Sequence, residues 1–114
     1  MHELSICYSL LNQVETLAQH HQAHQVASIT IQIGLLSGVE PELLRQAFTI
    51  ARAGTVAAQA DLICLSLPVK VRCQQCHAES EVEANRLLCK TCGAWQTQVI
   101  SGDEMLLASV ELIT

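Results

Sequence analysis

The sequence predicts an α+β fold in which two helices pack on a three-stranded sheet, with a small four-cysteine insert between the second and third strands. Two segments repeat apolar residues at helical spacing, and three segments alternate apolar and polar residues as half-buried strands do. Between the last two strands lie four cysteines in paired positions. The expected division is an α+β domain, residues 1–72 plus 96–114, and an insert, residues 73–95.

The first helix is predicted over residues 4–24, where apolar side chains recur every three or four positions and polar ones fill the opposite face. Cys7 lies on the apolar stripe and is expected to be a small core residue. His20, His21 and His24 are expected in the last turn, where the helix dipole favours positive charge. They fit a solvated helix end or, alternatively, a weak secondary metal patch.

The remaining elements follow in order along the chain. A strand is predicted over residues 26–36, and a helix begins near Pro41, with Leu43 on its buried face, and stops near Gly54. A second strand is predicted over residues 61–72, with Ile63 and Leu65 in its apolar row and Cys64 as a near-core thiol. A third strand covers roughly residues 104–113, after a turn signal at residues 101–103.

The insert contains two C-x-x-C pairs separated by twelve residues, and their members are Cys73, Cys76, Cys89 and Cys92. Zinc takes four such thiolates in a tetrahedron, and each pair presents two sulfurs on one side of a turn. Tetrahedral iron fits the same spacing, and a redox dithiol is the alternative to a metal site. The segment is polar, so metal binding is expected to supply its folding free energy. His77, directly after the first pair, is either a turn residue in the left-handed region or an alternative ligand.

Composition excludes several classes of function. A formal charge of −5 with six Lys and Arg residues argues against a nucleic-acid partner. The chain has no stretch approaching the ~20 apolar residues of a membrane span, and its first residues lack the pattern of a signal peptide. The protein is therefore expected in the reducing cytoplasm, where its six cysteines are thiolates and metal ligands rather than disulfides. The chain shows no nucleophile motif and no phosphate-binding loop, and a closed four-cysteine site leaves no catalytic position, so no enzyme is predicted.

The amino terminus offers a second set of metal ligands. The amine of Met1, the backbone nitrogen of His2 and the His2 imidazole can close adjacent chelate rings on one ion. Glu3 can add a fourth donor through its backbone nitrogen or its carboxylate. Nitrogen-rich, near-planar coordination of this kind suits Ni(II) or Cu(II) better than zinc.

Several motifs of the chain, taken together and in order, resemble the HypA/HybF family of hydrogenase nickel-incorporation proteins. These are MHELS at residues 1–5, IGLLSGVEPE at residues 33–42, the paired C-x-x-C motifs, and ISGDE at residues 100–104. The resemblance implies that His2 and Glu3 hold nickel and that the four cysteines hold zinc. Some members flank both zinc motifs with histidines, whereas this chain has His77 alone.

The same resemblance implies the partners. Family members pass nickel, together with a partner GTPase, to the large-subunit precursor of NiFe-hydrogenase. The sequence leaves open whether the chain forms a homodimer and which hydrogenase, or urease, receives the metal. The alternative function is that of a zinc-ribbon adaptor or regulator without nickel transfer.

Overall fold

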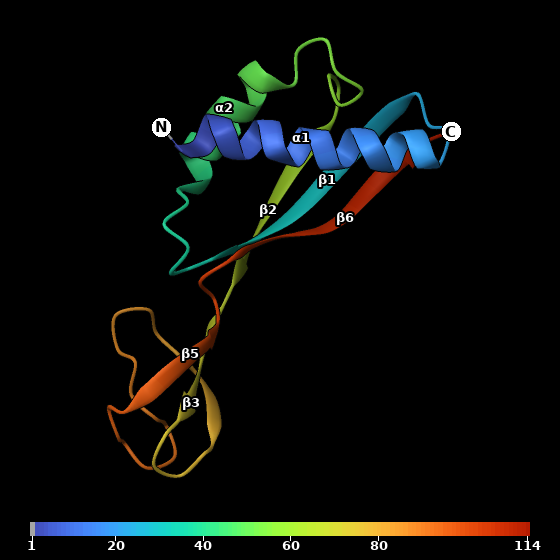
Figure 1. The fold of residues 1–114 in the computed structure, drawn as a ribbon. Coiled ribbons are helices and arrows are strands. Elements are labelled where there is room, and N and C mark those ends of the chain that lie inside the picture. The colour runs from blue at the N-terminus through green and yellow to red at the C-terminus, as the bar shows by residue number, and fades with distance from the viewer. Residues whose placement is uncertain (1) are drawn as a thin grey trace. The chain divides into compact units, whose positions relative to one another are not determined.

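Two helices and a three-stranded sheet form the first of two compact units in the structure, a computed structural model that describes residues 2–114 (Figure 1). The amine of Met1 and the side chain of His2 lie outside the described part of the chain. The predicted fold class is confirmed. The first unit comprises Met1–Gln32, Val39–Leu65 and Leu106–Thr114.

Helix α1, His2–His20, begins earlier and ends earlier than predicted. Its end is set by Gln22, which adopts a left-handed φ of 54°. The next amide, of Ala23, donates to the carbonyl of Ala18 at 2.8 Å, which closes a Schellman motif and stops the helix. His24 therefore lies outside the last turn, contrary to the prediction. None of the helices that the structure describes is long and apolar enough to cross a membrane.

Helix α2, Pro41–Ala51, begins as predicted, with Glu40 at its N-cap and Pro41 at its first position. Leu44, Phe48 and Ala51 are its buried residues, and the helix as a whole packs against α1. Leu43 was expected on this buried face, but half of its surface is exposed (50%). The buried stripe of α2, at positions 44, 48 and 51, is therefore narrower than the apolar pattern suggests.

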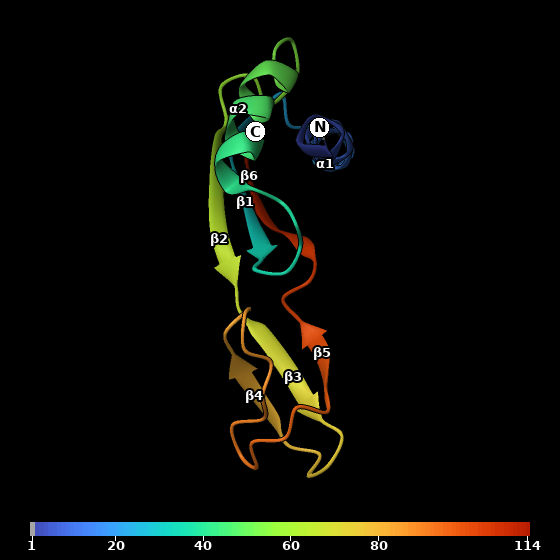
Figure 2. The same cartoon turned by 90° about the vertical axis from the view of Figure 1, so that its left-hand side faces the viewer.

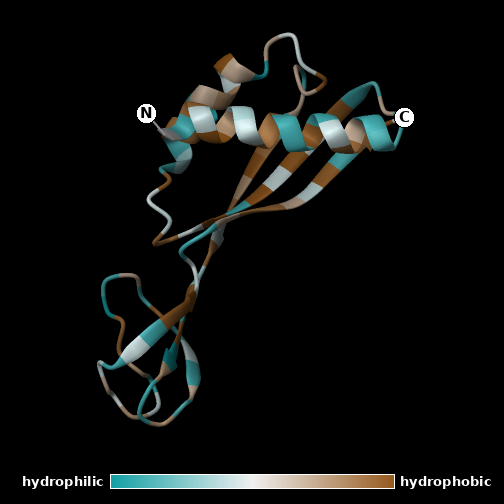
Figure 3. Ribbon diagram, in the orientation of Figure 1, coloured by the Kyte–Doolittle hydropathy of each residue, from teal (hydrophilic) through white to brown (hydrophobic). Residues whose placement is uncertain are grey.

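The sheet of the first unit has the strand order β2-β1-β6 (Figure 2). The bounds are β1 Gln25–Gly34, β2 Asp61–Leu67 and β6 Met105–Ile113. The buried row of β1 includes Ile29 and Ile31, as predicted. In β2 the prediction of the covered face was wrong: Ile63 and Leu65 are 42% and 47% exposed. Hydrophobic segments alternate with more polar ones along the strands of this sheet (Figure 3).

The single strand predicted over residues 61–72 is two strands, because Pro68 interrupts it. Proline has no amide hydrogen to continue a strand ladder, and here it separates β2 from β3, Val69–Cys73. β3 pairs antiparallel with β4, Glu79–Val82, and with β5, Thr97–Ser101. The result is a second three-stranded sheet, order β4-β3-β5, which the sequence did not reveal.

The second compact unit comprises Ile33–Gly38 and Ser66–Met105, so it extends beyond the insert expected at residues 73–95. Val69, Val71 and Val82 form an apolar cluster, against which Ala84, Leu87 and Val99 pack. The polar composition of the insert concealed this cluster, because half of it comes from the strands that flank the cysteines. Burial of apolar surface thus contributes to the stability of this unit beside the metal site.

Candidate metal centres

The four predicted cysteines lie at the tips of two equivalent turns. In the first turn, the amides of Gln75 and Cys76 point at the Sγ of Cys73, at 3.3 and 3.4 Å. In the second, the amides of Thr91 and Cys92 point at the Sγ of Cys89, both at 3.4 Å. Such N–H···S bonds stabilise thiolates, so each turn is built to hold a negatively charged sulfur.

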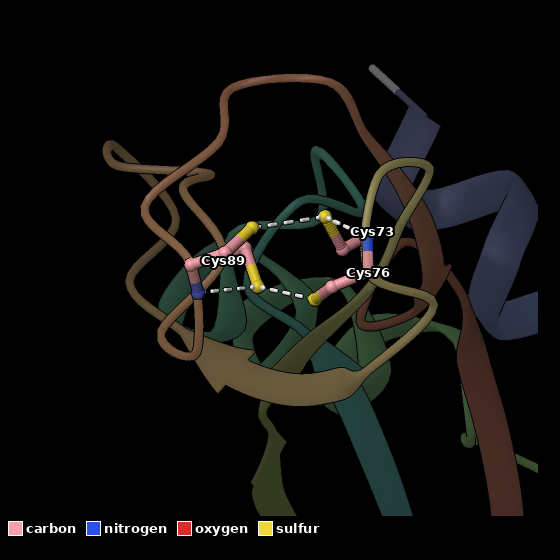
Figure 4. Close-up of side chains that lie close together, drawn as sticks. Cys73, Cys76 and Cys89 are labelled. Atoms are coloured by element: carbon pink, nitrogen blue, oxygen red, sulfur yellow. Dashed lines mark hydrogen bonds between the residues drawn. The ribbon is translucent and has the colours of Figure 1, made fainter.

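The four sulfur atoms converge on one point (Figure 4). All of them lie within 4.8 Å of one another. The Sγ atoms of Cys73 and Cys92 are 3.5 Å apart, and those of Cys76 and Cys89 are 3.6 Å apart. A tetrahedral ion with Zn–S bonds of about 2.3 Å requires sulfur separations of about 3.8 Å. The donor set therefore fits a tetrahedral ion such as zinc and leaves no open coordination position.

The environment of the first cysteine in each pair favours its charged form. The hydrogen bond from the amide of Cys92 is the main cause that lowers the pKa of Cys89 to about 6. The amide of Cys76 likewise lowers the pKa of Cys73. Metal binding requires deprotonated thiols, so an ion meets less proton competition at Cys73 and Cys89; the pKa values of Cys76 and Cys92, in contrast, are raised.

His77 occupies the same place in the first turn as Gly93 in the second. The amide of His77 donates to the carbonyl of Cys73 at 3.0 Å, and that of Gly93 to Cys89 at 2.8 Å. Both residues have left-handed backbones, with φ of 65° and 76°. The prediction of a turn residue is confirmed. His77 does not belong to the group of potential ligands, which consists of the four cysteines.

The second predicted site is at the start of α1. Glu3 lies in the first turn of the helix, directly after His2, and its side chain is partly buried. It lines a largely apolar cavity of about 290 Å³ with Leu4 and with residues of α2, among them Leu43 and Ile50. The sequence pattern did not predict this cavity, because it placed Leu43 in the core. In the structure Leu43 is half exposed and Ile50 is 67% exposed, so both side chains are available to line a surface cavity.

Cys7, Cys64 and the described histidines lie outside the four-cysteine group. Cys7 is fully buried, and its thiol donates to the carbonyl of Leu44 at 3.6 Å, which confirms it as a core residue. Burial is the main cause that raises the pKa of Cys7 to about 11 and that of Cys64 above its ordinary value. His20 and His21 are exposed at the end of α1, and no metal-ligand group forms around them among the side chains of residues 3–114.

Comparison with known proteins decides the family. The model of the family described as "Hydrogenase/urease nickel incorporation, metallochaperone, hypA" matches residues 1–112. The chain belongs to the HypA family. It is 49% identical over 114 residues to the hydrogenase maturation factor HypA of Nitrosospira multiformis, covering 100% of this chain and 99% of that protein. To HypA of Aquifex aeolicus it is 46% identical over 112 residues, with coverage of 98% and 97%.

Solved structures of HypA proteins share the fold. The solution structure of the nickel metallochaperone HypA from Helicobacter pylori has a TM-score of 0.75 and 27% identity, covering 97% of each chain. A second HypA solution structure has a TM-score of 0.78 and 29% identity, covering 99% of this chain and 97% of the other. The chain is thus a metallochaperone of hydrogenase maturation and not an enzyme.

Proposed function

We propose that the chain binds Ni(II) through the amine of Met1, through His2 and through Glu3, and that it delivers this ion to the large-subunit precursor of NiFe-hydrogenase. The observation that carries the proposal is that α1 begins at His2. The first amide groups of a helix have no hydrogen-bond partner within the helix. The backbone nitrogens of His2 and Glu3 are therefore free to act as ligands beside the imidazole, without breaking the helix that holds them.

The two metal centres have different chemistry, and this suits them to different tasks. Four thiolates form a closed tetrahedral site for zinc, which we assign a structural role. Nitrogen donors at the start of a helix suit nickel better than zinc. A thiolate site is stable in a reducing compartment, so we place the protein in the cytoplasm.

The test is nickel calorimetry on zinc-loaded protein with its native amino terminus. His2→Ala removes the imidazole, and one extra residue before Met1 converts the amine to an amide. Each should weaken nickel binding more than about 100-fold, because loss of an outer-shell partner alone costs 10–100-fold. His24→Ala, a histidine outside the proposed site, is the control and should keep full affinity.

The extended protein and His2→Ala are read separately. Full nickel affinity in the extended protein would eliminate the amine as a ligand, and full affinity in both would eliminate the amino-terminal site. Binding should also weaken as pH falls through about 8 to 6, because the amine and the imidazole must lose protons to bind metal. Zinc content and circular dichroism should stay unchanged in every variant.

We further propose that a partner GTPase contacts the nickel-bearing end of the first unit. The exposed Leu43 and Ile50 and the cavity beside Glu3 provide apolar surface there, and Glu40 and Glu42 are exposed at the start of α2. Reversing both charges (Glu40→Lys with Glu42→Lys) should slow association with the GTPase more at low salt than at high salt. Glu111→Lys, which changes an exposed acid on β6, is the control. An association rate that did not respond to the double reversal would remove these acids from the interface.

The alternative function, a zinc-ribbon adaptor without nickel transfer, predicts a different metal content. It requires one tightly held zinc and no nickel bound at the amino terminus, whereas the proposal requires both. Whether the chain forms a homodimer is a separate question, which sedimentation of the zinc-loaded protein would answer.

A further inference from the structure

The two basic side chains of the first unit line one cavity. Arg45 and Arg52 are the only Lys or Arg residues within the sequence ranges of that unit. They lie on α2 and at its C-cap, and they face a cavity of about 490 Å³ between α2 and the start of β2. Its other lining residues are Phe48, Thr49, Ala60, Asp61, Leu62 and Ile63.

Both guanidinium groups are held in place by the backbone of the opposite wall. Nη1 of Arg45 donates to the carbonyl of Leu62 at 3.0 Å, and Nη1 of Arg52 donates to the carbonyl of Ala60 at 2.8 Å. The Arg52 guanidinium also lies over the Phe48 ring, 5.7 Å from its centre. A guanidinium has five N–H donors, so each arginine keeps several for a ligand while its position is already fixed.

Neither positive charge is well neutralised within the described chain. Arg45 has one acidic neighbour, Glu42 at 3.7 Å, whose side chain is 75% exposed, and such a pair is weak. No carboxylate among residues 2–114 lies within 4 Å of the Arg52 guanidinium. The sequence ranges of the first unit hold six acidic residues and no Lys or Arg besides these two, so an anionic partner of that unit is attracted chiefly here.

We propose that this cavity binds a single carboxylate of a protein partner, carried by an acidic residue flanked by apolar residues. Two arginines and Asp61 give the lining a formal charge of +1, which balances one carboxylate but not a phosphate dianion. The walls formed by Phe48 and Ile63 suit the hydrocarbon beside such a carboxylate better than a bare hydrated ion. The arginines supply the planar pair of donors that a carboxylate accepts. This site is separate from nickel transfer and does not depend on it.

The test uses zinc-loaded, nickel-free full-length protein labelled with nitrogen-15. The probe is the peptide acetyl-Ala-Leu-Glu-Leu-Ala-amide, and the matched peptide has Gln in place of Glu. The acidic peptide should shift the Nε–Hε signals of Arg45 and Arg52, and the Gln peptide should not. Arg52→Gln should weaken the binding at least about tenfold, because a hydrogen bond to a charged group is lost. Arg86→Gln, which removes the same charge from the second unit, should leave it unchanged.

Two further measurements keep the result decisive. Asp61→Asn removes the acid from the lining, so it should strengthen binding of the peptide and allow inorganic phosphate to bind. This substitution leaves in place the hydrogen bonds from Arg45 to the carbonyl of Leu62 and from Arg52 to the carbonyl of Ala60. If neither arginine responds to the acidic peptide in the wild type or in Asp61→Asn, the arginines only anchor the helix and the proposal is wrong. Equal responses to inorganic phosphate and to the peptide in the wild type would also overturn it.

Discussion

At the scale of single residues, the surroundings of each cysteine separate metal ligands from core thiols. Cys73 and Cys89 accept amide hydrogen bonds that lower their pKa values, whereas burial raises the pKa of Cys7 to about 11. The sequence predicted the first group because a C-x-x-C spacing fixes its own turn geometry. The pKa of Cys7 and that of Cys64 depend on the elements packed around them, which spacing cannot reveal.

The raised pKa of Cys7 predicts a loss of stability in alkali. An unfolded thiol titrates near its ordinary pKa of 9.0, whereas the folded one keeps its proton to about 11. Above pH 9 the thiol loses its proton in the unfolded chain but not in the folded one, which lowers the free energy of unfolding. The contribution of Cys7 to that free energy falls by about 1–3 kcal/mol by pH 11. Cys7→Ala should cost about 1–2 kcal/mol at pH 7.5 in denaturant unfolding, and this cost should shrink at pH 10.5. The control Ile31→Val should cost the same at both pH values; a constant cost for Cys7→Ala would show that its thiol is not the titrating group.

At the scale of elements, the sequence predicted both helices and the three strands of the first sheet, but not where they end. The Schellman motif at Gln22 requires a glutamine in a left-handed conformation, which no sequence rule anticipates. The alternation of apolar and polar residues across residues 61–72 continues through Pro68, so the pattern does not show that β2 and β3 belong to different sheets. β4 and β5 were missed because four or five residues of mixed polarity give no clear period.

The backbone of Gly34 packs closely against that of Gly102, and this contact predicts the effect of a substitution at Gly34. A Cβ added to Gly34, at the end of β1, would lie 2.2 Å from the carbonyl oxygen of Gly102. The amide of Gly34 donates to the carbonyl of Glu104 at 2.8 Å, so the two segments cannot separate without losing this bond. Gly34→Ala should therefore destabilise the protein by about 3 kcal/mol in urea unfolding. Gly54→Ala, at φ 75° but in open space, should cost about 1 kcal/mol. Equal costs would mean that the contact at Gly34 relaxes freely.

At the scale of the whole molecule, the two units are stabilised by different means. The first has a core built from both helices and the sheet, including Val14, Ile29 and Leu44. The second has a small cluster around Val69, Val71 and Val82, together with the four-cysteine site. A domain of this size buries little apolar surface, so metal binding should supply much of its stability.

This difference predicts that the two units respond unequally to loss of the metal. Chelation of zinc, or Cys89→Ser, should abolish the dispersed amide signals of β3, β4 and β5 in a nitrogen-15 correlation spectrum. The signals of α1, α2 and β1 should persist, because their core contains no metal ligand. Cys64→Ser, which alters a thiol outside the site, should keep its zinc and both sets of signals. Dispersed signals of β3 without metal would show that the valine cluster suffices on its own. Loss of the α1 signals with the zinc would instead mean that the first unit cannot fold alone, and that the metal site supports the whole chain.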